Sequence, residues 1–326
     1  MPSNHRRGSV VEVDSLSPIV QGDDEREASA RSGVLMGLAA YTMWTSFPLY
    51  FKFLDHVAPI EILAHRIVWC SFFLLVFIGV TGAGGVLSGL FSSGRSLLTL
   101  LATALLVSTN WFTFIYAVTT DKVLESSLGY YINPLVSILL AAIFLRERTT
   151  VRQKISIGLA ALGVGVQTVI VGRLPVISLI LAFTFGLYGL VRKAAKVPAV
   201  TGLAVETTLL SPVALAYLFW LRSHGELSFL TAGKGTDILL SFSGILTATP
   251  LILYGGALNR VRLSTMGIMQ YVVPTGHFAW AVFAFGEPFT VGHLASFGFI
   301  WAGLILYSSE SLGRSRNAPQ ANLRIG

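Results

Sequence analysis

Long apolar blocks recur along this chain and are separated only by short polar connections. A helix needs about 20 apolar residues to cross the hydrocarbon core of a bilayer. Division of the chain at glycines, prolines and charged residues predicts ten such helices. They cover 33–54, 59–80, 96–118, 124–145, 153–171, 174–191, 200–221, 237–258, 264–285 and 289–309. The sequence therefore predicts an all-α integral membrane protein in a lipid bilayer.

Composition excludes a soluble enzyme with a single membrane anchor. Hydrophobic residues make up 53% of the chain and charged residues 12%, whereas a soluble domain carries about 25% charge. No connection between the apolar blocks is long enough to form a core of its own.

Lysine and arginine are distributed unevenly between the two sets of connections. With the N-terminus inside, the inner segments hold 17 of these residues and the outer segments 4, while Lys52 and Arg66 fall within spans. The positive-inside rule then places both termini in the cytoplasm. This bias also explains the net charge of +7, so no nucleic-acid partner is expected.

A pattern of Tyr-x-x-Pro, followed thirteen residues after the proline by Glu, occurs twice at an offset of 140 residues. It begins at Tyr131 in the fourth expected span and at Tyr271 in the ninth. Two repeats of five helices must have opposite orientations, because five is odd. Inverted repeats are typical of secondary transporters, whose substrate sites lie near mid-membrane; a duplication that now serves only folding is the alternative.

The repeat predicts how the chain is organised. We expect a disordered polar tail at 1–32, five-helix repeats at 33–171 and 172–310, and a second tail at 311–326. The first tail lacks the apolar stretch that a signal peptide needs.

The fourth expected span carries an unusual set of polar residues for a membrane helix. Glu125, Gly129 and Asn133 repeat every four residues, with Tyr130 alongside, so they share one helix face. Polar groups at this depth are tolerated only inside protein or beside a water-filled cavity. We therefore expect this face to line a cavity.

Two prolines occupy equivalent positions in the repeats. Pro134 and Pro274 lack the N–H group that would bond the carbonyls of Tyr130 and Gln270, respectively. We expect both prolines to act as hinges.

Polar residues of the expected spans lie at two mirrored depths. Arg66, Asn110 and Asn133 fall roughly 9–13 Å from the outer face, and Glu206, Gln270 and Tyr271 roughly 9–11 Å from the inner face. An in-plane pseudo-two-fold axis would produce this mirroring.

The candidate site residues are drawn from these depths and their neighbours. The expected substrate-binding residues are Trp44, Arg66, Asn110, Trp111, Tyr130, Tyr131, Asn133, Gln270 and Tyr271. Arg66 is expected to bind or balance an anionic group, such as a substrate carboxylate, because a deep charge needs a cavity or a buried partner. Glu61, Glu125 and Glu206 are the expected proton or counter-charge sites. Ion pairing, interface anchoring or plain packing is the structural alternative for each, and His277 is assigned no role.

Several catalytic patterns are missing from the sequence. It contains no complete nucleotide-binding loop, His-Glu-x-x-His motif, cysteine cluster or Gly-x-Ser-x-Gly motif. We expect no cofactor, no metal site and no enzymatic activity. A membrane-embedded enzyme acting on a lipid-linked substrate, or a scaffold or sensor, is the alternative to transport.

Seven segments carry a resemblance to a known family. They are AAYTMW (39–44), EILAHRIVW (61–69), NWFTFIYAV (110–118), ESSLGYYINPL (125–135), FLRER (144–148), FGLYGLVRK (185–193) and RLSTMGIMQY (262–271). Together they resemble the RarD-type branch of the EamA family in the drug/metabolite transporter superfamily, across about 32–310.

The resemblance implies a ten-helix plasma-membrane transporter with two EamA repeats and a central cavity. It implies export or exchange of small metabolites, such as amino acids or drugs, by alternating access. One departure is visible at the end of the fourth span. The family usually has Gly-Glu there, but Arg146 precedes Glu147 in this chain, while Gly286 and Glu287 keep the pattern.

Overall fold

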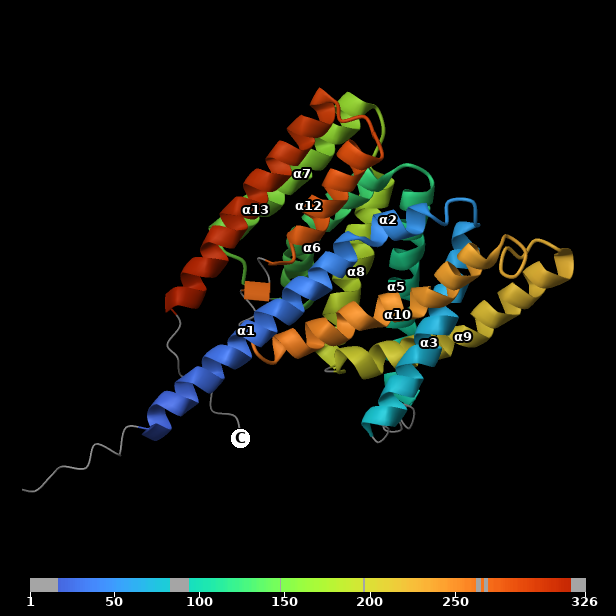
Figure 1. The fold of residues 1–326 in the computed structure, drawn as a ribbon. Helices are drawn as coiled ribbons and strands as arrows, with labels where there is room; N and C mark the ends of the chain where they lie inside the picture. Colours follow the sequence, from blue (N-terminus) through green and yellow to red (C-terminus); the bar gives the residue numbers. More distant parts are fainter. Residues whose placement is uncertain are drawn as a thin grey trace, which may run out of the picture.

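A computed structural model of the chain describes residues 17–82, 94–146, 148–195, 197–261, 265–266 and 269–317. Within these ranges every regular element is a helix (Figure 1). The helices are α1 (Ser17–Thr45), α2 (Phe47–Lys52), α3 (Pro59–Thr81), α5 (Gly94–Thr119), α6 (Val123–Phe144), α7 (Val151–Val171), α8 (Val176–Ala195), α9 (Ala199–His224), α10 (Lys234–Leu258), α12 (Val272–Ala279), η2 (Trp280–Ala284) and α13 (Val291–Asn317).

Eight of these helices are long and apolar enough to cross a membrane, namely α3, α5 to α10 and α13. They match eight of the ten expected spans, and the protein is a multi-pass membrane protein. The first and ninth expected spans take a different form.

The first expected span, 33–54, consists of two helices. A one-residue turn at Ser46 separates α1 from α2, and Pro48 stands in the first turn of α2. In addition, α1 begins at Ser17, so residues 17–32 are helical where the sequence predicted a disordered tail. Glutamate, alanine and arginine, which are frequent in this stretch, all favour helix. Residues 1–16 lie outside the described ranges.

The ninth expected span, 264–285, is interrupted. A turn at Gln270 and Tyr271 precedes α12, and η2, a π-helix, ends the span. Pro274 therefore lies in the first turn of a short helix. By contrast, α6 continues without a break past Pro134. The two equivalent prolines thus have different surroundings in this conformation.

The two ends of the helix bundle differ in how their connections are held. At one end, the Glu287 carboxylate accepts hydrogen bonds from the N–H groups of Val123 (2.6 Å) and Leu124 (2.8 Å), at the start of α6. A carboxylate there satisfies N–H groups that have no partner within the helix. We call this end the Asp121 end, because Asp121 lies in the connection before α6. The opposite end is called the Arg148 end, because Arg148 lies in the connection after α6.

Helix packing follows a regular pattern. The contact between α1 and α10 has a counterpart in the contact between α5 and α8. Likewise, the contact between α1 and α12 has a counterpart in the contact between α6 and α8. α3 packs on α9, α6 on α12, and α7 on α13, with α7 and α13 side by side along one flank (Figure 1). If each of the first five expected spans is exchanged with the span five positions later, every one of these pairs becomes a pair in the same set.

Glycines allow the closest helix approaches. A Cβ atom at Gly244 of α10 would lie 2.3 Å from the backbone carbon of Trp69 in α3. A Cβ atom at Gly129 of α6 would lie 2.7 Å from the carbonyl oxygen of Ser178 in α8. Small residues at such interfaces let helices pack through van der Waals contact in a membrane, where the hydrophobic effect does not drive association.

The contact at Gly244 predicts a specific loss of stability. Gly244→Ala should destabilise the protein by roughly 1–3 kcal/mol, because backbone atoms of α3 would have to move. Gly255→Ala is the matched control in the same helix, since nothing lies within 4 Å of a Cβ atom there. Thermal unfolding of both variants in detergent measures the difference. Equal unfolding temperatures for Gly244→Ala and wild type would contradict the close approach.

Candidate functional site

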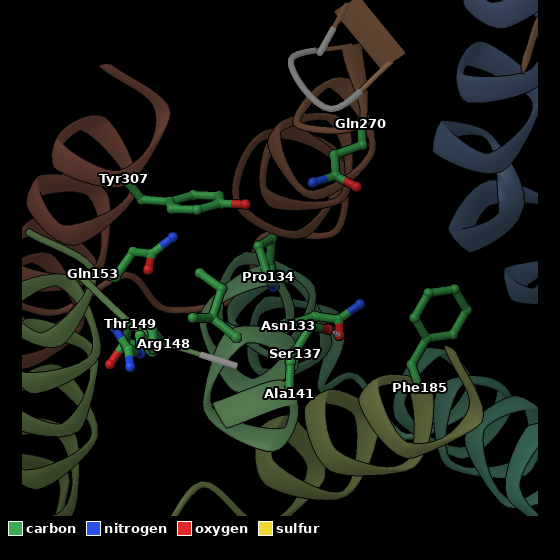
Figure 2. Close-up of a pocket in the computed structure, with 11 residues that line it drawn as sticks. Asn133, Pro134, Ser137, Ala141, Arg148, Thr149, Gln153, Phe185, Gln270 and Tyr307 are labelled. Carbon is green, nitrogen blue, oxygen red and sulfur yellow. Dashed lines mark hydrogen bonds between the residues drawn. The ribbon is translucent and has the colours of Figure 1, made fainter. Parts of the chain in front are cut away.

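A cavity of about 460 Å³ lies between α6, α7, α8, α13 and the segment before α12. Its volume is within the range of small-molecule sites. The cavity extends to the Arg148 end of the bundle. Its lining is formed by Asn133, Pro134, Ser137, Ile138, Ala141, Arg148, Thr149, Gln153, Phe185, Gln270 and Tyr307 (Figure 2).

Three of the residues singled out from the sequence line this cavity. Asn133 and Pro134 come from α6, and Gln270 comes from the turn before α12. Tyr271, the next residue, is half-buried against the main core and is not part of the lining. Sequence reasoning missed Ser137, although it continues the Asn133 face by one helical turn.

Arg66 lies in a second cluster, apart from the cavity lining. Its side chain is 4% exposed, and its Nε donates a hydrogen bond to Thr247 Oγ1 at 2.8 Å. The guanidinium carbon lies 4.0 Å from the centroid of the Trp111 ring, a cation–π contact. Its Nη1 atom is buried without a hydrogen-bond partner. Within the described ranges, no ion pair includes Arg66.

This lack of a counter-charge is unusual. Removing a guanidinium from water costs several kcal/mol, and a buried carboxylate ordinarily offsets that cost. The guanidinium carbon also lies 5.5 Å from the ring centroids of both Phe47 and Phe51. Arg66 is thus stabilised by aromatic rings and a hydroxyl group, and its buried Nη1 is left for a further partner.

Tyr130 lies between the cavity lining and the cluster around Arg66. It lies one turn before Pro134 on the same face of α6, and two phenylalanine rings link it to Arg66: Phe114 lies 6.1 Å from Phe51, whose ring is 5.5 Å from the Arg66 guanidinium carbon. Its ring packs against Phe114, with centroids 5.9 Å apart, and against His277 at 5.6 Å. Aromatic packing therefore occupies the position between the cavity and Arg66.

His277 is a residue that the sequence interpretation missed. Its Nε2 donates a hydrogen bond to the carbonyl oxygen of Trp44 at 3.0 Å. That carbonyl has no partner within its own helix, because Pro48 stands four residues later and has no N–H group. His277 therefore joins α12 to the turn between α1 and α2. The Trp44 ring packs against Tyr41 and Tyr254, with centroids 5.7 Å away from each.

Two of the three expected counter-charge residues bind backbone N–H groups. Glu61 Oε1 accepts from the N–H groups of Ser228 at 2.8 Å and Phe229 at 3.1 Å. Glu125 Oε1 accepts from the N–H group of Ile177 at the start of α8, at 3.2 Å. These contacts hold connections at the Asp121 end, and neither carboxylate lines the cavity.

Glu206, the third, is fully buried in an ion pair. Its Oε1 lies 3.4 Å from Arg192 Nη1 and accepts a hydrogen bond from Thr103 Oγ1 (2.6 Å), while its Oε2 accepts one from the Tyr188 hydroxyl (3.2 Å). Gly202 makes room for the guanidinium, since a Cβ atom there would lie 1.5 Å from Arg192 Nη1. The group that Glu206 balances in this conformation is the Arg192 side chain.

Two further candidates bind neighbouring helices. Asn110 Nδ2 donates to the carbonyl oxygen of Leu181 and to Thr184 Oγ1, both at 3.0 Å, which ties α5 to α8. The Tyr131 hydroxyl is 2.8 Å from Thr275 Oγ1, which ties α6 to α12. Both side chains therefore position helices around the candidate site.

In the part of the chain that the structure describes, no group of three or more His, Cys, Asp or Glu side chains is placed to hold a metal ion.

Comparison with known proteins places the chain in a family. The profile of the EamA-like transporter family matches residues 31–168. An uncharacterized transporter of Vibrio cholerae is 40% identical over 295 residues, which are 90% of this chain and 98% of that protein. The chain belongs to the EamA-like transporter family.

Its relatives in this family include RarD proteins, which confirms the resemblance found in the sequence. Protein RarD of Escherichia coli is 41% identical over 88% of this chain and 97% of its own length. The chloramphenicol-sensitive protein RarD of Pseudomonas aeruginosa is 30% identical over 86% and 94%, respectively. One crystal structure, 19% identical, superimposes with a TM-score of 0.55 over 85% of this chain and 96% of its own. That likeness shows a shared fold.

The ion pair between Glu206 and Arg192 predicts a coupled effect on stability. Glu206→Gln or Arg192→Gln alone should cost about 3–5 kcal/mol, because each leaves an uncompensated buried charge. The double variant should recover part of this loss. Thermal unfolding of the two single variants and the double variant in detergent measures the coupling. Strictly additive losses would contradict the ion pair, and Arg222→Gln, at an exposed arginine of α9, is the control for loss of charge.

Proposed function

We propose that this protein is a secondary transporter that exports or exchanges small metabolites by alternating access, and is not an enzyme. The observation that carries the proposal is the cavity, which brings Pro134 of one half together with Gln270 of the other. Pro134 belongs to the first copy of the repeated sequence pattern, and Gln270 directly precedes the second copy. The names of its relatives, among them an uncharacterized transporter of Vibrio cholerae, support transport in general.

In this proposal the helices form two inverted five-helix repeats, at 33–171 and 172–310. The exchange of packing pairs between the halves supports this arrangement. The excess of lysine and arginine in one set of connections supports a cytoplasmic location for the Arg148 end and for both termini, in the plasma membrane.

The conformation then corresponds to an inward-facing state. The cavity extends to the Arg148 end, while Glu287 holds the start of α6 at the opposite end. Only the proline segment of the second repeat is interrupted, just before Pro274. In the outward-facing state we expect the two proline segments to exchange these conformations, as a pseudo-symmetric mechanism requires.

Arg66 is the proposed principal substrate contact, with Trp111 and Tyr130 beside it. Its unpartnered Nη1 supports this assignment, because the protein leaves a strong donor available at membrane depth. Asn133 and Gln270 would orient the substrate in the cavity.

Arg66→Ala should lower flux by roughly 30-fold or more, since loss of a desolvated charged contact costs about 2–5 kcal/mol. Arg66→Lys should restore little, because lysine offers a point charge in place of a planar fork. The measurement is flux in sealed proteoliposomes, with a compound found by thermal-shift screening of amino acids and antibiotics. Wild-type flux in Arg66→Ala would remove Arg66 from the site. A chemically changed product, or neither flux nor product, would contradict transport.

The paired prolines predict a change in turnover. Pro134→Ala and Pro274→Ala should each lower maximal flux several-fold and change substrate affinity less, because a conformational step is altered more than the binding contacts. Pro212→Ala is the matched control, since Pro212 lies inside α9 outside the repeated pattern. Initial flux against substrate concentration, normalised to folded protein, gives both quantities. Unchanged maximal flux in the first two variants would show that these prolines are packing features.

A further inference from the structure

We propose that the cavity selects small organic anions, and that Arg148 is the specificity-determining residue at its entrance. On this view Arg148 receives the carboxylate or phosphate group of the substrate before that group reaches Arg66. The inference rests on the proposed function, because it names the substrate class that the same cavity would carry.

The charge of the cavity lining is the first observation. Among the 11 described lining residues, Arg148 is the single charged side chain and no carboxylate is present (Figure 2). The other polar members are neutral amides and hydroxyls, as at Asn133 and Gln153. Arg148 is exposed and makes no hydrogen bond or ion pair with any described residue. Its guanidinium therefore gives the described lining a net positive charge.

The acidic side chains described near this end are not part of the cavity lining. Glu310 of α13 accepts a hydrogen bond from Thr150 Oγ1 at 2.8 Å and is not part of the cavity lining. Glu147, the neighbour of Arg148 in the chain, lies outside the described residues. Deeper in the bundle, Glu206 is paired with Arg192.

A continuous helix face joins the two arginine positions. From the entrance the lining follows α6 through Ser137 and Asn133. One turn further along that face is Tyr130, whose ring packs on Phe114; Phe114 in turn packs on Phe51, which lies under the Arg66 guanidinium. A cationic substrate would thus meet a guanidinium at each end of its path. An anion would be attracted by both guanidinium groups. The apolar surroundings would increase the difference in electrostatic energy between an anion and a cation.

The competing explanation is that Arg148 only helps to orient the protein in the membrane. Cytoplasmic connections carry arginine for this reason, whatever the substrate. Arg152 provides the matched control, because it is an exposed arginine in the first turn of α7 and is not part of the cavity lining. An orienting charge would be equivalent at both positions, whereas a selective charge is needed only at Arg148.

The test measures the electrostatic potential in the cavity. Ser137→Cys is introduced into the full chain in which Cys70, the only cysteine, is replaced by Ala. The cysteine is then reacted with two methanethiosulfonates, one carrying a sulfonate and one a trimethylammonium group. Each rate is divided by the rate with a free thiol in solution. Because this readout does not require transport, its failure is distinguishable from failure of the proposed function.

We expect the normalised anion-to-cation rate ratio at Cys-substituted Ser137 to exceed one. Arg148→Gln should lower the ratio about fivefold or more, Arg148→Lys should keep it, and Arg152→Gln should change it by less than about twofold. A ratio that does not fall in Arg148→Gln would overturn the proposal. An equal fall in Arg152→Gln would also overturn it, since the effect would then belong to the whole end of the bundle.

Ligand protection tests the substrate class in the same protein. Benzoate, phenyl phosphate, benzamide and benzylamine are compared as inhibitors of the labelling reaction. Slower labelling with benzoate or phenyl phosphate, weakened by Arg148→Gln, is the expected result. The proposal would be overturned if benzylamine or benzamide protected as well as both anions or better. It would also be overturned if neither anion protected the cysteine.

Discussion

Water cannot reach most of the interior of this helix bundle, so its polar groups must find their partners within the protein. The carboxylates show how this constraint organises the structure. Glu61, Glu125 and Glu287 each accept hydrogen bonds from backbone N–H groups of another segment. Each contact joins parts of the chain that are far apart in sequence. The requirement for hydrogen bonding thus positions the connections at the Asp121 end as much as helix packing does.

Arg66 differs from the other buried arginine of the described ranges, Arg192, because no carboxylate lies beside it. Glu206 lies 3.4 Å from Arg192 and balances its charge, whereas Arg66 has the Thr247 hydroxyl and the faces of aromatic rings, among them Trp111. A fold that provides carboxylates for other buried groups has left this guanidinium partly unsatisfied. Such a residue is costly to stability and useful for binding, because the missing partner can be a ligand that arrives from outside.

Sequence periodicity led to the parts of the cavity lining that depend on one helix or on the repeat. The spacing around Asn133 and the paired prolines led to α6 and to the turn at Gln270, both of which line the cavity. The same spacing could not show which polar residues face the cavity. Glu125 shares the face of Asn133, yet it binds the start of α8, which lies 52 residues away in the chain. Phe185 and Tyr307 line the cavity because of tertiary packing, for which the sequence carries no local pattern.

The fit of Arg192 into the space above Gly202 limits how this part of the protein can evolve. Any larger residue at position 202 would occupy the volume of the guanidinium. Loss of the arginine would make room, but it would leave Glu206 as a buried charge without its partner. Position 202 therefore cannot vary freely while Arg192 and Glu206 remain, and Arg192 cannot vary freely while Glu206 remains. Positions 192, 202 and 206 therefore form an epistatic group: a larger residue at 202 displaces the guanidinium from Glu206, and loss of Arg192 is best tolerated when Glu206 changes with it.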